Sequence, residues 1–137
     1  MRPCIWYCPI ASLFHDHNTT HFSICNNCYP RGCIFVGHGL SQDFRIINIC
    51  IPPNQIIDTA EIYHQFNQRY ISLRYLTNFV LGRDMQQEVH DSIEDARAAN
   101  ELYLKALSLK HDGKFDEYLM NLYAHGHSTQ FKLGIAK

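Results

Sequence analysis

Two short β-branched runs, separated by a helical segment, constrain the fold of this chain most strongly. CIFV (33–36) leads into the turn GHG (37–39), which indicates a buried strand that ends at a turn. NQIIDT (54–59) follows two prolines and is typical of a second strand. Between the two runs, an apolar helical face is formed by Leu40, Phe44 and Ile47.

Three longer helices are predicted downstream, over 72–81, 92–109 and 114–126. Ser72 is placed to cap the first of them, and Gly82 and Gly126 are placed to end the first and the third. The side chains expected to face the core are Leu73, Leu76 and Val80, then Ile93, Ala96, Tyr103 and Leu107, and finally Phe115, Leu119, Leu122 and Tyr123. This alternation of strands and helices predicts an α/β domain.

Length and composition describe one ordinary globular domain. The 137 residues are 46% hydrophobic and 18% charged, with a net charge of −1. A protein that holds nucleic acid through its own surface is usually basic, so bound metal ions or a local patch would have to supply the positive charge here. No apolar run approaches the roughly 20 residues that span a bilayer. Prolines interrupt the N-terminal MRPCIWYCPIASLF, and no secretory cleavage site follows it, so we expect reduced cysteines.

Residues 1–30 differ from the rest and are expected to be irregular. They contain four of the six cysteines and show no sustained strand or helix period. The spacing permits a structural zinc site as one alternative, although neither cysteine pair has the glycine-bearing turn of a zinc knuckle. Its ligands would be drawn from Cys4, Cys8, Cys25 and Cys28, with His15, His17 and His21 in reserve.

Polar residues at the ends of the predicted elements are the candidates for chemistry. They are Asp43, Asp58, His90 and Asp95. An ionised aspartate suits Mg²⁺, and a histidine with a pKa near neutral can take a proton from an attacking water. Together they suit metal-assisted hydrolysis of a phosphodiester. Taken singly, Asp43 reads as a surface acid, His90 as a loop residue and Asp95 as a capping partner of Ser92.

Longer stretches of the sequence resemble a known family. FVGHGLSQDF (35–44) and VHDSIEDARAA (89–99) resemble the second and third motifs of the DEDDh exonucleases, which are named after four acids and a histidine. With the intervening segments, residues 31–137 resemble the nuclease domains of poly(A)-specific deadenylases. The further stretches that carry this resemblance are IPPNQIIDT (51–59), ISLRYL (71–76) and KFDEYLMNLYAHG (114–126).

The resemblance implies a ribonuclease H-like α/β fold and hydrolysis of poly(A) RNA from its 3′ end. In this family Asp43 and Asp95 would bind metal, and His90 would be the general base. Two divalent ions, Mg²⁺ or Mn²⁺, would serve as cofactors. The implied partners are a poly(A) tail and the regulatory subunit of the PAN deadenylation complex, with no membrane. The implied location is the cytoplasm, including P-bodies.

The family's first motif, Asp-x-Glu, has no match ahead of Asp43. The only earlier acid is Asp16, and Asn18 stands where the motif has Glu. We therefore expect residues 31–137 to be the C-terminal part of the nuclease domain, without its first antiparallel strands. Since two-metal hydrolysis needs ligands for both ions, we expect the nuclease activity of this chain to be reduced or lost. A non-catalytic remnant that binds RNA or a partner is the alternative.

Overall fold

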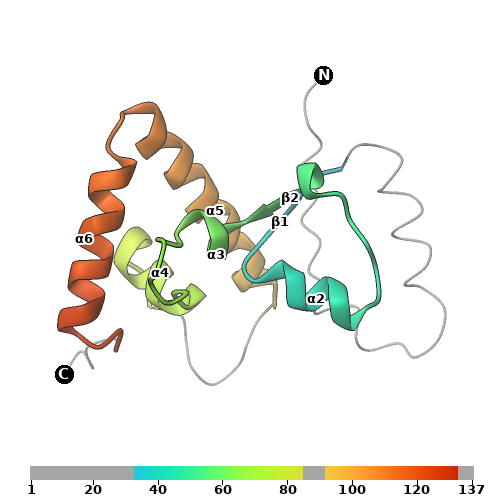
Figure 1. Ribbon diagram of the computed structural model, residues 1–137, viewed down its shortest axis with the longest axis horizontal. Helices are drawn as coiled ribbons and strands as arrows, with labels where there is room; N and C mark the ends of the chain where they lie inside the picture. Colours follow the sequence, from blue (N-terminus) through green and yellow to red (C-terminus); the bar gives the residue numbers. More distant parts are fainter. Residues whose placement is uncertain (1–32, 85–91, 133–137) are drawn as a thin grey trace.

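The computed structural model of the protein describes residues 33–84 and 92–132 (Figure 1). Figure 1 shows the three longest helices gathered at one end of the molecule and the strands with the first helix at the other. In chain order the elements are β1 (Phe35–Gly37), α2 (Leu40–Ile46), the 3₁₀-helix η3 (Pro53–Gln55), β2 (Ile56–Asp58), α3 (Thr59–Ile62), α4 (Leu73–Leu81), α5 (Ser92–His111) and α6 (Phe115–Ser128).

The two predicted strands form and pair in parallel. Phe35 lies opposite Ile56, and Gly37 lies opposite Asp58. Within the described ranges the sheet has two strands. The second strand is shorter than NQIIDT predicted, because Asn54 and Gln55 belong to η3. Pro53 begins that turn, where its fixed φ and missing N–H are tolerated.

Helix α5 is the centre of the structure, since it contacts α3, α4, α6 and β1. Its predicted inner face was wrong at two of four positions, since Ala96 and Tyr103 are half-buried but Ile93 and Leu107 are not. Ile93 and Leu107 are 47% and 45% exposed. The residues that α5 buries are instead Ala98, Ala99, Leu102 and Ala106. Small alanines let several neighbouring elements approach one helix closely, and a prediction based on bulky side chains overlooks such a face.

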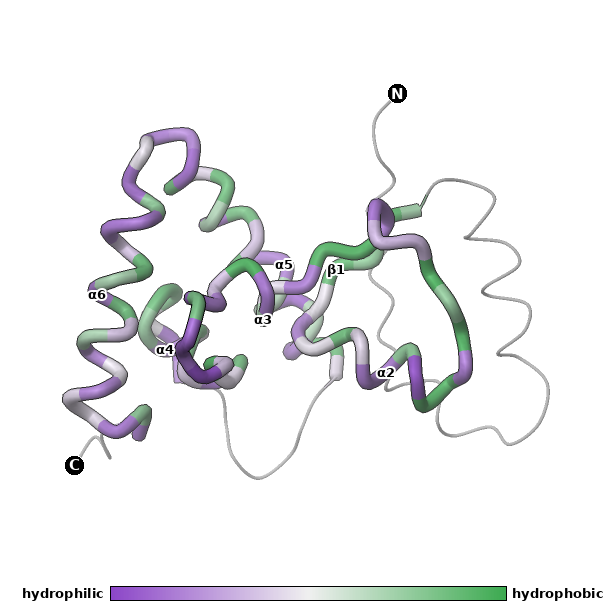
Figure 2. The backbone as a smooth tube through the Cα atoms, viewed as in Figure 1, coloured by the Kyte–Doolittle hydropathy of each residue, from purple (hydrophilic) through white to green (hydrophobic). Residues whose placement is uncertain are grey.

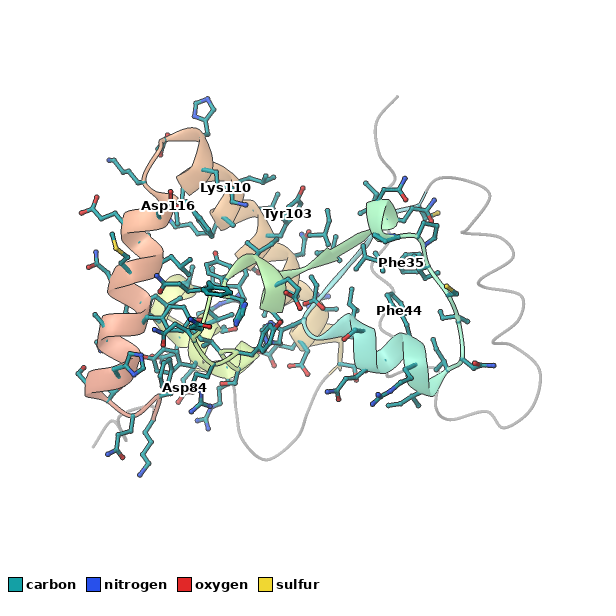
Figure 3. The ribbon with its side chains drawn as sticks, viewed as in Figure 1. Phe35, Phe44, Asp84, Tyr103, Lys110 and Asp116 are labelled. Atoms are coloured by element: carbon teal, nitrogen blue, oxygen red, sulfur yellow. The ribbon has the colours of Figure 1, made fainter. Side chains whose placement is uncertain are left out.

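Two hydrophobic clusters fill the interior. The smaller lies under the strands, where the rings of Phe35 and Phe44 meet edge to face at 5.7 Å, with Leu40 and Ile51 beside them (Figure 3). The larger cluster lies among helices α3, α4, α5 and α6. Its fully buried members include Tyr63, Leu76, Leu102 and Leu122. Figure 2 shows the hydrophilic turn between α5 and α6 and the hydrophobic segment that leads from α2 to η3. Among the described residues, no helix has the length and apolar character needed to cross a membrane.

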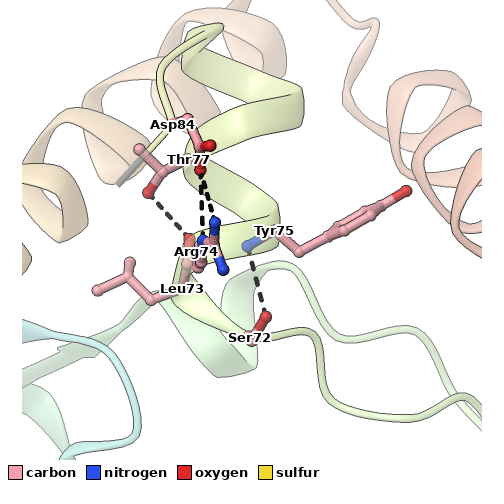
Figure 4. Close-up of polar contacts among 6 residues, drawn as sticks. All are labelled: Ser72, Leu73, Arg74, Tyr75, Thr77 and Asp84. Carbon is pink, nitrogen blue, oxygen red and sulfur yellow. Dashed lines mark hydrogen bonds and ion pairs between the residues drawn. The ribbon is translucent and has the colours of Figure 1, made fainter. Parts of the chain in front are cut away.

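The cap predicted for α4 is confirmed. The Ser72 hydroxyl accepts a hydrogen bond from the Tyr75 amide (Figure 4). Gly82 ends the helix. Thr77 is buried, and its hydroxyl donates to the Leu73 carbonyl at 2.9 Å, so its polar atom is satisfied. Outside, Arg74 pairs with Asp84 at 3.1 Å. Helix α4 is therefore capped at both ends, and its Tyr75 and Leu76 side chains face the core.

Helix α6 continues two residues past the predicted end at Gly126. Its buried Phe115, Leu122 and Tyr123 confirm the predicted face. Gly126 is buried because the ring of Phe131 folds back over it, and the Phe131 amide donates to the Gly126 carbonyl at 2.7 Å. Gly126 thus allows a close contact within the helix, and it does not act as a stop.

Replacing Gly126 by alanine is expected to lower stability by about 1–3 kcal/mol, because the added methyl would overlap the Phe131 ring. Thermal unfolding followed by circular dichroism measures the loss. In a Phe131→Ala background the same change should be neutral or stabilising, since alanine favours helix over glycine by about 1 kcal/mol. An equal loss in both backgrounds would contradict this account of Gly126.

Candidate active site

The turn between β1 and α2 is held by one carboxylate. Asp58 Oδ1 accepts hydrogen bonds from the amides of Gly39, at 2.8 Å, and Ala60, at 2.9 Å, while Oδ2 accepts from Leu40 at 2.8 Å. The side chain therefore caps α3 and also holds the first amides of α2. Gly39 lies at φ 77, in the left-handed region that favours glycine, and this lets the chain turn sharply into α2. Asp58 is thus a structural anchor, although its position at a strand end had suggested chemistry.

A second set of bonds crosses the same turn from His38. Its Nδ1 lies 3.0 Å from Thr59 Oγ1, and its Nε2 lies 3.1 Å from the Ile71 carbonyl oxygen. The Thr59 hydroxyl also donates to the Gly37 carbonyl at 2.9 Å. Burial lowers the pKa of His38, while the charges of Asp58 and Asp95 and the bond to Ile71 oppose this shift. The ring is consequently held neutral among polar partners.

Asp43 lies in helix α2, just after the turn, and its carboxylate differs from that of Asp58 in its hydrogen bonding. It lies in the first turn of α2, and no hydrogen bond or ion pair of the described residues engages its carboxylate. Burial, and then the negative charge of Asp58, raise its pKa above 3.8. A carboxylate whose charged form is disfavoured in this way would gain from a bound cation. This is the behaviour expected of a metal ligand.

Asp95 lies in the first turn of α5, as predicted. Its charge is felt at His38, as is that of Asp58, while Asp58 also acts on Asp43. Since α5 packs on β1, the fold brings the third-motif aspartate towards the turn that carries His38. His90 lies outside the described residues, so its predicted role stays a prediction.

The family's divalent ions suit the kind of donor found here, but the number of donors is short. Asp43 and Asp95 offer carboxylate oxygens, the ligands that Mg²⁺ and Mn²⁺ prefer. Within the described ranges, no group of three or more His, Cys, Asp or Glu residues is arranged to hold a metal. Mg²⁺ commonly keeps several waters and takes one or two protein carboxylates. The described residues therefore match one hydrated ion in donor chemistry, and they do not make up a two-metal centre.

The sequence did not reveal the supporting roles of Asp58, Thr59 and His38. The GHG turn was visible as a break between strand and helix, but its partners lie 19 to 33 residues downstream. The available signal was the strand register. Pairing Gly37 with Asp58 brings that carboxylate beside the amides of the turn.

In a comparison with protein families, residues 19–103 match the exonuclease model RNase_T. Among individual proteins, the chain is 52% identical over 102 residues to the PAN2-PAN3 deadenylation complex catalytic subunit PAN2 of Kluyveromyces lactis. It is 51% identical over 102 residues to the same subunit of Saccharomyces cerevisiae. Each match covers 74% of this chain and spans 9% of the relative's length.

Solved structures agree with this assignment. The Saccharomyces cerevisiae Pan2 pseudoubiquitin hydrolase–RNA exonuclease module in complex with A7 RNA matches with a TM-score of 0.72 and 50% identity, over 74% of this chain and 17% of that one. The Neurospora crassa Pan2 catalytic unit matches with a TM-score of 0.65 and 52% identity, over 67% of this chain and 15% of that one. The α/β, ribonuclease H-like fold expected from the sequence is thereby confirmed, with a short sheet. On its family match and on this fold, the chain belongs to the exonuclease (RNase_T) family.

Proposed function

We propose that this chain is part of a 3′–5′ exoribonuclease that shortens poly(A) tails. The observation that carries the proposal is the contrast within the candidate site. Asp58 is fully engaged by backbone amides, whereas the Asp43 carboxylate has no partner among the described residues and a raised pKa. An acid held in this state on an exonuclease fold is suited to binding a cation that faces RNA phosphate.

Each proposed site residue has a distinct role. Asp43 and Asp95 would hold a divalent ion, which when bound supplies a Lewis acid beside the scissile phosphate. His90 would take a proton from the attacking water, since a neutral imidazole has a suitable pKa. Asp58 and His38 would not touch RNA, because their polar atoms are occupied within the turn.

The proposed substrate and partners follow from the relatives. One matched structure is a complex with A7 RNA, and the matched subunits belong to PAN2-PAN3 complexes. We extend both to this chain, with poly(A) RNA as substrate and a PAN3-type subunit as partner. The cytoplasm, including P-bodies, is the proposed location.

Degradation of a 5′-labelled oligoadenylate by the purified chain, with Mg²⁺ or Mn²⁺, tests the proposal. Stepwise shortening with release of AMP is expected at a reduced rate, since the first-motif ligands have no match in the sequence, and either His90→Ala or Asp95→Ala should abolish it. An Asp116→Asn variant serves as the control. Asp116 is an exposed acid on α6, and this helix does not belong to the candidate site (Figure 3).

Three outcomes separate the possibilities. Shortening that survives both substitutions would assign the activity to other residues or to a contaminant. A folded chain that binds oligoadenylate without shortening it would favour the non-catalytic alternative. A folded chain that neither binds nor shortens the RNA would refute the proposed function for this chain.

A further inference from the structure

We propose that His38 is a positioning residue that fixes the start of α2, and with it Asp43, by tying the turn to two other segments. The inference deepens the proposed function, on which its consequence for catalysis rests. The geometry itself depends on neither metal nor RNA.

The first tie runs from His38 to the start of α3. Thr59 is fully buried, and its hydroxyl lies between His38 Nδ1 and the Gly37 carbonyl at 3.0 and 2.9 Å. A hydroxyl carries one proton, so Thr59 serves either acceptor at a time. Both acceptors belong to the turn, and Thr59 therefore holds it in either state.

The second tie runs to the segment ahead of α4. The Ile71 carbonyl can only accept, so His38 Nε2 must carry the proton of this 3.1 Å bond. Ile71 is buried in the larger cluster together with Tyr75 and Leu76. The bond consequently couples the turn before Asp43 to the helical core of the molecule.

Both ties act on the turn that Asp58 also holds, but they involve other atoms of that turn. Asp58 accepts hydrogen bonds from the amides of Gly39 and Leu40. Thr59 instead bonds to the His38 ring and to the Gly37 carbonyl, which precede those amides. Hydrogen bonds therefore hold both the amide donors and the carbonyl acceptor of the turn. Asp43 lies three residues after Leu40 in the same helix, so the orientation of that helix sets the position of the carboxylate.

The neutral Nε2–H form of the ring is the specific signature of this arrangement. The direct groups at the ring are Thr59 and Ile71, and the carboxylates of Asp58 and Asp95 act on it through charge. Nitrogen-15 NMR of the histidine-labelled chain should show a protonated Nε2 and an unprotonated Nδ1 at neutral pH. The resonances are assigned by their loss in His38→Gln. A proton on Nδ1 together with an unprotonated Nε2 would overturn the proposal.

Amide hydrogen exchange tests the positioning itself. In His38→Leu, exchange at Gly39 and Leu40 should accelerate about tenfold or more, with a lower backbone order parameter at Asp43. Exchange at Leu102 and Leu122, which report on the core, should be unchanged. His38→Gln keeps an amide donor near the Nε2 position and should restore most of the protection.

The outcomes decide the proposal whether or not the chain hydrolyses RNA. Unchanged exchange at Leu40 in His38→Leu would overturn it. Equal acceleration at Leu40 and Leu102 in both variants would also overturn it, because His38 would then support only global stability. If His38→Leu does not fold, His38→Gln decides: retained protection of Gly39 and Leu40 is expected, and loss of that protection with a retained core would overturn the proposal.

Discussion

Replacing Asp58 by alanine is expected to destabilise the protein by about 3 kcal/mol or more. Three backbone amides, those of Gly39, Leu40 and Ala60, lose their acceptor at once. Each buried donor left without a partner costs about 1–3 kcal/mol, and two helix starts lose their cap. Because a domain of this size is stable by only about 5–15 kcal/mol, the variant should unfold at a much lower denaturant concentration. Urea unfolding measures the change.

Asp58→Asn separates the charge from the shape of the side chain. Asparagine keeps one carbonyl oxygen, so it should retain part of the bonding to Gly39 and Ala60 and lose that to Leu40. An intermediate stability is expected, and Asp84→Asn on the surface provides the control for removal of an acid. An Asp58→Ala variant within about 1 kcal/mol of the parent would refute the structural role of Asp58.

Asp43→Asn should have the opposite effect on stability and a large effect on hydrolysis. Burial and the charge of Asp58 raise the Asp43 pKa, so the folded state binds a proton more tightly than the unfolded state does. Ionised Asp43 therefore opposes folding above its raised pKa, and removing the charge should raise the melting temperature at pH 7. Hydrolysis should fall about a hundredfold or more, since a ligand of the reacting site is lost.

The pH dependence checks the sign of this effect. As pH falls through the raised pKa of Asp43 towards 3.8, the parent gains the proton and loses the penalty. The advantage of Asp43→Asn should thus shrink in acid. Differential scanning calorimetry of both proteins at pH 7 and at pH 4 measures it. An advantage that grows in acid would mean that the charge of Asp43 stabilises the fold.

Local signals in the sequence predicted the elements well where a single segment decides the structure. Ser72 and Gly82 bounded α4, and the spacing of Leu40 and Phe44 predicted the buried face of α2. Prediction was poorer where a distant partner decides. The inner face of α5 depends on four neighbouring elements, and Gly126 depends on Phe131, which follows the helix.

The candidate site shows the same division. Asp43 and Asp95 were identified from their motifs, and both lie in first helical turns as expected. Asp58 was a candidate because it closes the second predicted strand, and it has a different role, because the strand register turns its carboxylate towards backbone amides. Residue type and position at an element end were alike for Asp43 and Asp58. Only the hydrogen bonds that each side chain makes distinguish them.

Direct measurement of Mn²⁺ binding tests the central claim that Asp43 is the free, cation-seeking acid of this site. Electron paramagnetic resonance of free Mn²⁺ during titration with the folded chain reports affinity without requiring turnover. We predict saturable binding that Asp43→Asn weakens about tenfold or more and that Asp116→Asn leaves unchanged. Equal affinity in the parent and in Asp43→Asn, or no binding by the folded parent, would contradict the account.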